Sequence, residues 1–146
     1  WMGGPTSTQH FAGLRFPDLV TTPVAKADFI TEFKNGTADY KLQVEAGAIA
    51  LEVFQKNPDH PCAAHYAIHA FDHPDLARLA LPSAKRYAKI APASHHAQHM
   101  SAHIFVQLGM WPDAVISNKN GWNTSIDWVE KKKLPRSERD YHSLQL

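Results

Sequence analysis

Apolar residues recur at helical spacing along most of the chain after residue 39. Residues 40–56 carry a broad apolar face, with Lys41, Glu45, Glu52 and Lys56 outside it. The same pattern predicts helices over 62–71, 75–90, 95–108 and 113–122, followed by a polar connection over 123–139 with a short helix near 126–131. No segment shows the alternation of a strand between hairpin turns, so the chain is predicted to be all-α.

Start and stop signals divide this pattern. Asn57-Pro58 ends the first helix, because the residue before a proline is driven out of the α region. Pro61 suits the first turn of the next helix, Ser94 is an N-cap, and Gly109 is a helix stop. Pro82 is expected to kink or divide the helix over 75–90. A last helix, over 138–146, is expected to begin at a Ser137 or Asp140 cap.

The segment 1–39 differs in pattern from the rest of the chain. Gly3-Gly4-Pro5, Pro17 and Pro23 interrupt any helical pattern, which predicts an irregular arm or a partial helix over 1–28. A short helix is expected over 29–33, closed by Asn35-Gly36. The chain is therefore divided into an irregular or partly helical segment, 1–39, and a helical domain, 40–146.

Composition narrows the function classes. The chain has 146 residues, 44% hydrophobic and 20% charged, as in an ordinary globular domain. The net charge of +1 gives no nucleic-acid footprint, and no apolar run approaches the roughly 18 residues that a membrane span requires. Because the chain begins at Trp1 and ends within an expected helix, we interpret it as a processed or incomplete piece of a longer protein; its compartment is not indicated.

Histidine is the unusual residue, with 10 copies in the chain. His65 and His69 are four positions apart, and so are His99 and His103; the offset between the two pairs is 99 − 65 = 34. Side chains at i and i+4 lie on one face of a helix. A period of about 34 residues is the length of a tetratricopeptide helix–turn–helix unit.

Other stretches of the chain also resemble parts of a tetratricopeptide unit. The stretch Leu108–Ala114, with its glycine, aromatic, acidic and small positions, resembles the turn of a tetratricopeptide unit. The segments 57–69, 86–92 and 99–105 are similar to those of uncharacterised bacterial tetratricopeptide-repeat proteins. The resemblance implies a tetratricopeptide-like α-solenoid with units near 27–60, 61–94 and 95–128, and it implies fold more than activity.

The resemblance also implies which side chains line a concave groove. The first helix of each tetratricopeptide unit faces that groove. The positions that match those of the family are Cys62, His65, His69, Asp72, His73, His96, His99, His103, Val106 and Gln107. His142 is a candidate for the start of a further helix of this kind.

The histidines of this groove suggest two functions, and a third interpretation gives them no function. In the first, the protein is a scaffold that binds an acidic or C-terminal peptide or protein partner through the histidine-lined groove, as helical-repeat proteins commonly do. In the second, His65, His69, His99 and His103 bind zinc or copper, with Cys62, His96 or His142 as additional ligands. In the third, the second histidine pair merely copies the first through repetition of the unit.

Catalysis is less well supported. The residues between the paired histidines include no glutamate of the kind that zinc proteases use as a base, so a bound metal favours storage, sensing or an oxidative copper role. A lone cysteine, Cys62, is a weak signal for a nucleophile. Because tetratricopeptide units bury their faces against neighbours, we expect a longer parent chain or self-association.

Overall fold

The computed structural model describes residues 33–34, 37–38 and 40–146. In this part of the chain five α-helices follow one another: α4 (Lys41–Lys56), α5 (Pro61–Ala70), α6 (Ala77–Ile90), α7 (His95–Gln107) and α8 (Trp111–Lys132). Two 3₁₀ helices come after them, η1 (Arg136–Glu138) and η2 (Tyr141–Leu144). The prediction of an all-helical domain is confirmed for residues 40–146.

A small hairpin precedes the helices. Strand β1 (Phe33–Lys34) pairs antiparallel with β2 (Thr37–Ala38), with Phe33 opposite Ala38. The helix expected over 29–33 is therefore wrong at Phe33, while residues 29–32 and the arm expected over 1–28 lie outside the described residues. A strand pair this short leaves no period-2 pattern long enough to recognise in the sequence.

The predicted helix boundaries hold where a cap fixes them. α5 begins at Pro61, and the preceding His60 accepts a hydrogen bond through Nδ1 from the Ala63 amide at 3.2 Å. Ser94 Oγ accepts from the Ala97 amide at 3.2 Å at the start of α7. Beyond the end of α7, Gly109 has φ +68°, a conformation that glycine adopts without steric cost.

Two predictions about helix ends need correction. Pro82, expected to kink or divide its helix, does not divide it, since α6 runs through Pro82 as one helix. Pro82 is exposed, so water can bond the carbonyl of Arg78 that has lost its helical partner. α8 also continues through Gly121 to Lys132 instead of ending at residue 122.

Gly121 shows why a glycine persists inside α8. A Cβ atom at this position would lie 2.9 Å from Ser143 Oγ and 3.1 Å from His99 Cβ. The glycine therefore lets α7 and the C-terminal segment approach α8 closely, and its role is packing rather than helix termination.

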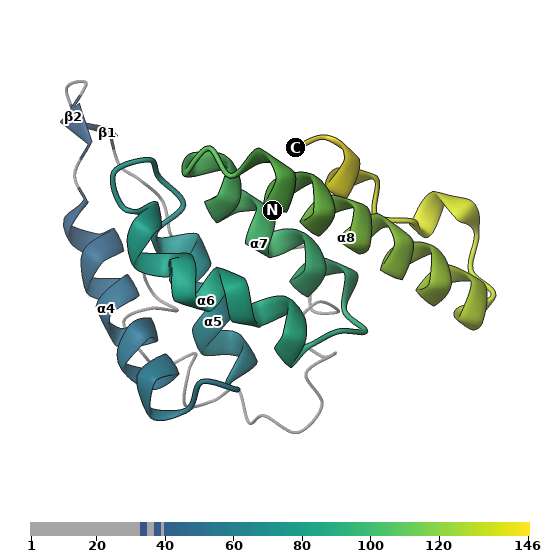
Figure 1. Ribbon diagram of the computed structural model, residues 1–146, viewed down its shortest axis with the longest axis horizontal. Helices are drawn as coiled ribbons and strands as arrows, with labels where there is room; N and C mark the ends of the chain where they lie inside the picture. The colour runs from purple at the N-terminus through teal and green to yellow at the C-terminus, as the bar shows by residue number, and fades with distance from the viewer. Residues whose placement is uncertain (1–32, 35–36, 39) are drawn as a thin grey trace.

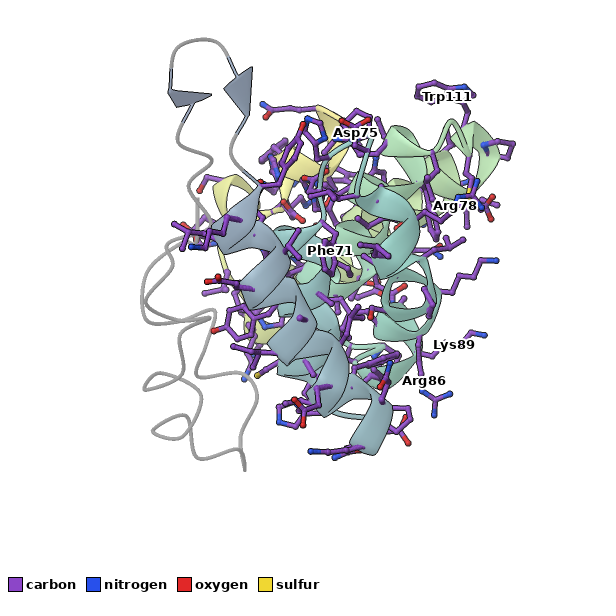
Figure 2. The ribbon with its side chains drawn as sticks, turned by 90° about the vertical axis from the view of Figure 1, so that its left-hand side faces the viewer. Phe71, Asp75, Arg78, Arg86, Lys89 and Trp111 are labelled. Carbon is purple, nitrogen blue, oxygen red and sulfur yellow. The ribbon has the colours of Figure 1, made fainter. Side chains whose placement is uncertain are left out.

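The helices succeed one another across the molecule from α4 to α8, each packed against the next (Figure 1). α5 also contacts α7, and η2 packs on α8. Phe71 lies inside this helical body, whereas Arg86, Lys89 and Trp111 project from it (Figure 2). Because α5 touches α7 as well as its neighbours in the chain, a side chain on the inner face of α5 can reach α7.

Small side chains allow these close approaches. α5 buries a row of alanines almost completely, and larger side chains from α5 itself, its C-cap and the neighbouring helices fill the remaining space. The largest of these are Tyr87, Phe71, Ile68, Met100 and Ile104. Gly47 of α4 sits directly against the ring of Phe71, and a methyl group there would overlap the ring. Within the described residues, none of the helices combines the length and hydrophobicity needed to cross a bilayer.

Candidate metal centre

Three histidines from two helices converge at a first site, which we call triad 1: His65, His69 and His96. His65 and His69 lie one turn apart on α5, and their Nε2 atoms are 3.0 Å apart. His96, from the first turn of α7, places its Nε2 atom 3.0 Å from His65 Nε2. His65 is therefore the central residue of triad 1, and it is 8% exposed.

A second set, triad 2, consists of His99, His103 and His142. His99 and His103 lie one turn apart on α7, with their Nε2 atoms 3.1 Å apart. His142 comes from η2, and its ring centroid is 4.7 Å from that of His99. His99 is fully buried, while His142 is exposed, so triad 2 extends from the interior to the surface.

The spacing of the ring nitrogens suits one metal ion per triad. In each triad, one potential ligand atom from each histidine lies within 4.8 Å of the others. Tetrahedral zinc with bonds of about 2.0–2.1 Å separates its ligand nitrogens by roughly 3.3 Å. The observed Nε2–Nε2 distances of 3.0–3.1 Å are slightly shorter, so an entering ion would require only a small outward movement of the rings.

The outer ring nitrogens of triad 2 have defined partners. Asp72, just beyond α5, lies with Oδ2 2.9 Å from His103 Nδ1, and its Oδ1 accepts from Gln107 Nε2 at 2.9 Å. Asn118 of α8 lies with Oδ1 2.7 Å from His99 Nδ1. The same amide donates from Nδ2 to the carbonyl of Leu146 at 3.2 Å, which fixes its orientation.

These contacts assign the tautomers of His99 and His103. An ionised carboxylate and an amide oxygen only accept hydrogen bonds, so Nδ1 of each ring carries the proton. A neutral ring protonated at Nδ1 has its lone pair at Nε2. The two Nε2 lone pairs then face each other at 3.1 Å, where a metal cation would satisfy both. Carboxylate-to-histidine-to-metal chains of this type are the usual outer support of metal ligands.

Burial favours the neutral form of four of these rings, all three of triad 1 and His99 of triad 2. Burial, reinforced by repulsion from neighbouring histidines, lowers the pKa of His65 well below its usual value. Burial likewise lowers the pKa of His69 and of His96 to about 4 and also lowers the pKa of His99. Neutral imidazole is the form that ligates metals, so these rings need not lose a proton before binding an ion at neutral pH.

Asp72 remains ionised despite its partial burial. Burial by itself raises the pKa of its carboxyl, but the hydrogen bonds from His103 and Gln107 outweigh this effect, and the net pKa is lowered. A negative charge held next to His103 favours a metal ion bound at the other nitrogen of that ring.

A second contact between a carboxylate and a histidine anchors the segment that carries His142. Asp140 lies with Oδ2 3.1 Å from His95 Nδ1 and accepts from Ser143 Oγ at 2.5 Å. It also caps η2 by accepting from the Ser143 amide at 3.4 Å. The Asp140 cap predicted from the sequence is thus present, although the helix that follows is 3₁₀ and four residues long.

The structure rearranges the residues expected at the site. His65 and His69 belong to triad 1, whereas His99 and His103 belong to triad 2, so the four do not form one group. His96 and His142, expected only as additional ligands, each complete a triad. Cys62 is buried and belongs to neither triad. Asp72 lies behind His103 instead of facing a groove by itself.

Sequence reasoning missed Asn118. Asn118 lies 19 residues from His99 and carries no motif, so only the packing of α8 on α7 reveals it. Gln107, which the tetratricopeptide resemblance placed in the groove, donates to the Asp72 carboxylate that holds His103.

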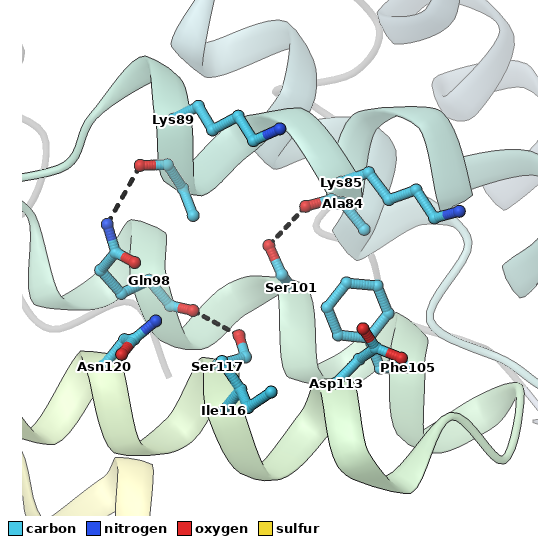
Figure 3. A pocket seen from close by; sticks show the side chains of 11 residues that line it. Ala84, Lys85, Lys89, Gln98, Ser101, Phe105, Asp113, Ile116, Ser117 and Asn120 are labelled. Carbon is cyan, nitrogen blue, oxygen red and sulfur yellow. Dashed lines mark hydrogen bonds between the residues drawn. The ribbon is translucent and has the colours of Figure 1, made fainter.

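An open pocket of about 280 Å³ lies on the other face of α7 (Figure 3). The residues that line it include Phe105, Ile116, Lys85, Lys89 and Asp113. Inside it, Gln98 Nε2 donates to the Ala88 carbonyl at 3.0 Å and Ser101 Oγ to the Ala84 carbonyl at 2.6 Å (Figure 3). None of the described residues that line this pocket is a histidine, so it is separate from the triads.

Comparison of the chain with known proteins identifies no family that has this arrangement of histidines. No protein-family model matches the chain, and neither a curated protein nor a solved structure matches it. The function must therefore be argued from the two triads themselves.

Proposed function

We propose that this chain is a transition-metal-binding protein in which triad 1 and triad 2 each hold one ion. One observation carries the proposal: the Nε2 atoms of His99 and His103 face each other at 3.1 Å, while Asp72 and Asn118 hold their outer nitrogens. The opposed lone pairs of two neutral rings repel each other, whereas a cation placed between them would be attracted by both.

The donor set indicates the class of metal. All ligand atoms in both triads are imidazole nitrogens. Imidazole suits zinc, copper, nickel and iron, whereas magnesium and calcium prefer oxygen donors. Three protein ligands leave a fourth position open, which is typical of reactive or exchangeable metal sites rather than of closed structural ones. Zinc and copper are therefore the cofactors we propose.

The helical arrangement supports a tetratricopeptide-like fold as part of the proposal. The offset between the starts of α5 and α7 is 95 − 61 = 34, and the offset between the starts of α6 and α8 is 111 − 77 = 34. The pairs α5–α6 and α7–α8 thus repeat with the period of a tetratricopeptide unit, which is about 34 residues. On this proposal α5 and α7 are the equivalent first helices of two repeated units, and their histidines lie close together because both helices turn the same face to the same side of the array.

Partner binding in a histidine-lined groove stays a prediction, as does self-association. The histidines expected to recognise a partner bond to one another and, in triad 2, to Asp72 and Asn118. This arrangement supports metal ligation more directly than it supports recognition of a peptide carboxylate.

Metal analysis of purified protein tests the proposal. Metal-free protein is incubated with Zn²⁺ or Cu²⁺, passed through a desalting column and analysed for bound metal. We expect two ions per chain, and about one ion in each of the variants His96→Ala and His142→Ala, which remove one incompletely buried ligand per triad.

Matched controls separate ligand loss from unfolding. His73→Ala removes a histidine outside both triads and should retain both ions. Circular dichroism should show unchanged helicity in all three variants, and a double His65→Ala/His99→Ala variant should bind no metal stoichiometrically. Wild-type protein without stoichiometric zinc or copper would contradict the proposal.

A further inference from the structure

We infer that triad 1 and triad 2 form one paired centre, in which two metal ions lie close enough to share a small bridging ligand such as hydroxide. The inference rests on the proposed function, because it requires an ion in each triad. The paired centre goes beyond the proposed function because its two ions would interact, whereas ions in two independent sites would not.

The first support is the register of ligands on α7. His96 belongs to triad 1 and His99 to triad 2. They are three residues apart on one helix, so their Cβ atoms are about 5–6 Å apart on the same face. The triads are therefore neighbours along α7, with about one helical turn of roughly 5.4 Å between them.

The second support is the linkage through α5. His69 is a member of triad 1, and Asp72, three residues later, holds His103 of triad 2 at 2.9 Å. Both triads are thus attached to the same end of α5 as well as to α7.

The third support is the number of ligands. Among the residues that the structure describes, groups of three potential metal ligands occur only in these two triads, each with one nitrogen per histidine. Each ion would retain an open position, and adjacent open positions can be filled by one shared ligand. Water bound to such an ion has a pKa near 7, so it releases a proton to solvent and leaves hydroxide. Paired sites of this type hold their ions about 3.5–4 Å apart.

Small molecules can reach the centre from one side. His142 is exposed, and His69, His96 and His103 are partly exposed, while His65 and His99 are buried. The buried pair lies in the interior, and the other four histidines keep part of their surface in contact with solvent. A bridging ligand can therefore exchange with solvent.

Electron paramagnetic resonance of the copper-loaded protein tests the pairing. Metal-free protein is titrated with Cu²⁺, and the double-integrated signal is compared with the bound copper measured by elemental analysis. We expect two bound Cu²⁺ ions with a signal accounting for less than half of them, because close, bridged Cu²⁺ ions couple their spins. Loading with an equal mixture of Cu²⁺ and Zn²⁺ should restore signal per copper.

Two variants sharpen the result. His142→Ala should bind one Cu²⁺ with a full, isolated signal, whereas His73→Ala should retain two ions and the diminished signal. Two bound ions with a full signal would overturn the pairing and leave the proposed function standing. A single bound ion in the wild type would overturn the pairing and also contradict the proposed function for one of the two triads. Absence of any bound copper or zinc would instead overturn the proposed function.

Discussion

Asp72 offers the sharpest test of how the protein supports its ligands. The substitution Asp72→Asn preserves the shape of the side chain but removes its negative charge. If the new amide turns its NH₂ group toward His103, that ring must protonate Nε2 and loses its metal-binding lone pair. If it turns its oxygen there, its NH₂ group meets the Gln107 amide donor at the position of a 2.9 Å hydrogen bond. Either orientation therefore weakens triad 2.

The expected magnitude follows from the contact that is lost. A hydrogen bond to a charged group contributes about 1.5–3 kcal/mol, and about 1.4 kcal/mol corresponds to a tenfold change in affinity. The His103 and Asp72 side chains are 20% and 27% exposed, so solvent screens the pair only in part. We expect Zn²⁺ binding at triad 2 to weaken by about 10–100-fold, the range typical of outer-sphere partners of metal ligands.

The assay is competition for Zn²⁺ against a chromophoric chelator, in a His96→Ala background that weakens triad 1. Asp75→Asn is the matched control, because it removes the same charge from a side chain that is 72% exposed and contacts neither triad. A change in Zn²⁺ affinity of less than about threefold in Asp72→Asn, or one no larger than in Asp75→Asn, would show that Asp72 does not support triad 2.

Three further predictions concern stability and reactivity. Gly47→Ala should destabilise the fold by about 1–3 kcal/mol in urea, since overlap with Phe71 outweighs the better helix propensity of alanine; an increase in stability would contradict this packing. Ser94→Ala should cost about 1 kcal/mol in the same measurement through loss of the α7 cap, and Ser94→Asp should recover most of it; equal stability of both variants would argue against the cap. Burial raises the pKa of the Cys62 thiol to about 11, so alkylation of the native protein should be slow at pH 8 and should accelerate as the pH rises toward 11; a midpoint near the ordinary value of about 8.5 would contradict its burial.

The helices could be predicted because local signals specify them. Pro61, Ser94 and Gly109 fix helix ends through backbone geometry and capping, which depend only on nearby residues. The placement of each i, i+4 histidine pair on one helix face could also be predicted, because it depends only on the spacing of nearby residues. The helix end predicted at residue 122 is wrong because the polar stretch after it packs against the C-terminal segment, as the close approach of Ser143 to Gly121 shows, and that contact is distant in sequence.

The division of the histidines into two triads could not be predicted. It depends on whether His96 turns toward α5 or toward its own helix neighbours, and on where the chain after α8 returns to place His142. Both are properties of packing between elements. The outer partner Asn118 is likewise specified only once α8 lies on α7.

The separate origin of His142 has a consequence for biosynthesis. The last ligand of triad 1 is His96 and the last of triad 2 is His142, so the two sites are completed at points of the chain that differ by 142 − 96 = 46. At a translation rate of about 5–20 residues per second, roughly 2–9 s pass between them. A nascent chain could therefore capture its first ion while its second site still lacks a ligand, and metal supply during synthesis would determine which ion enters first.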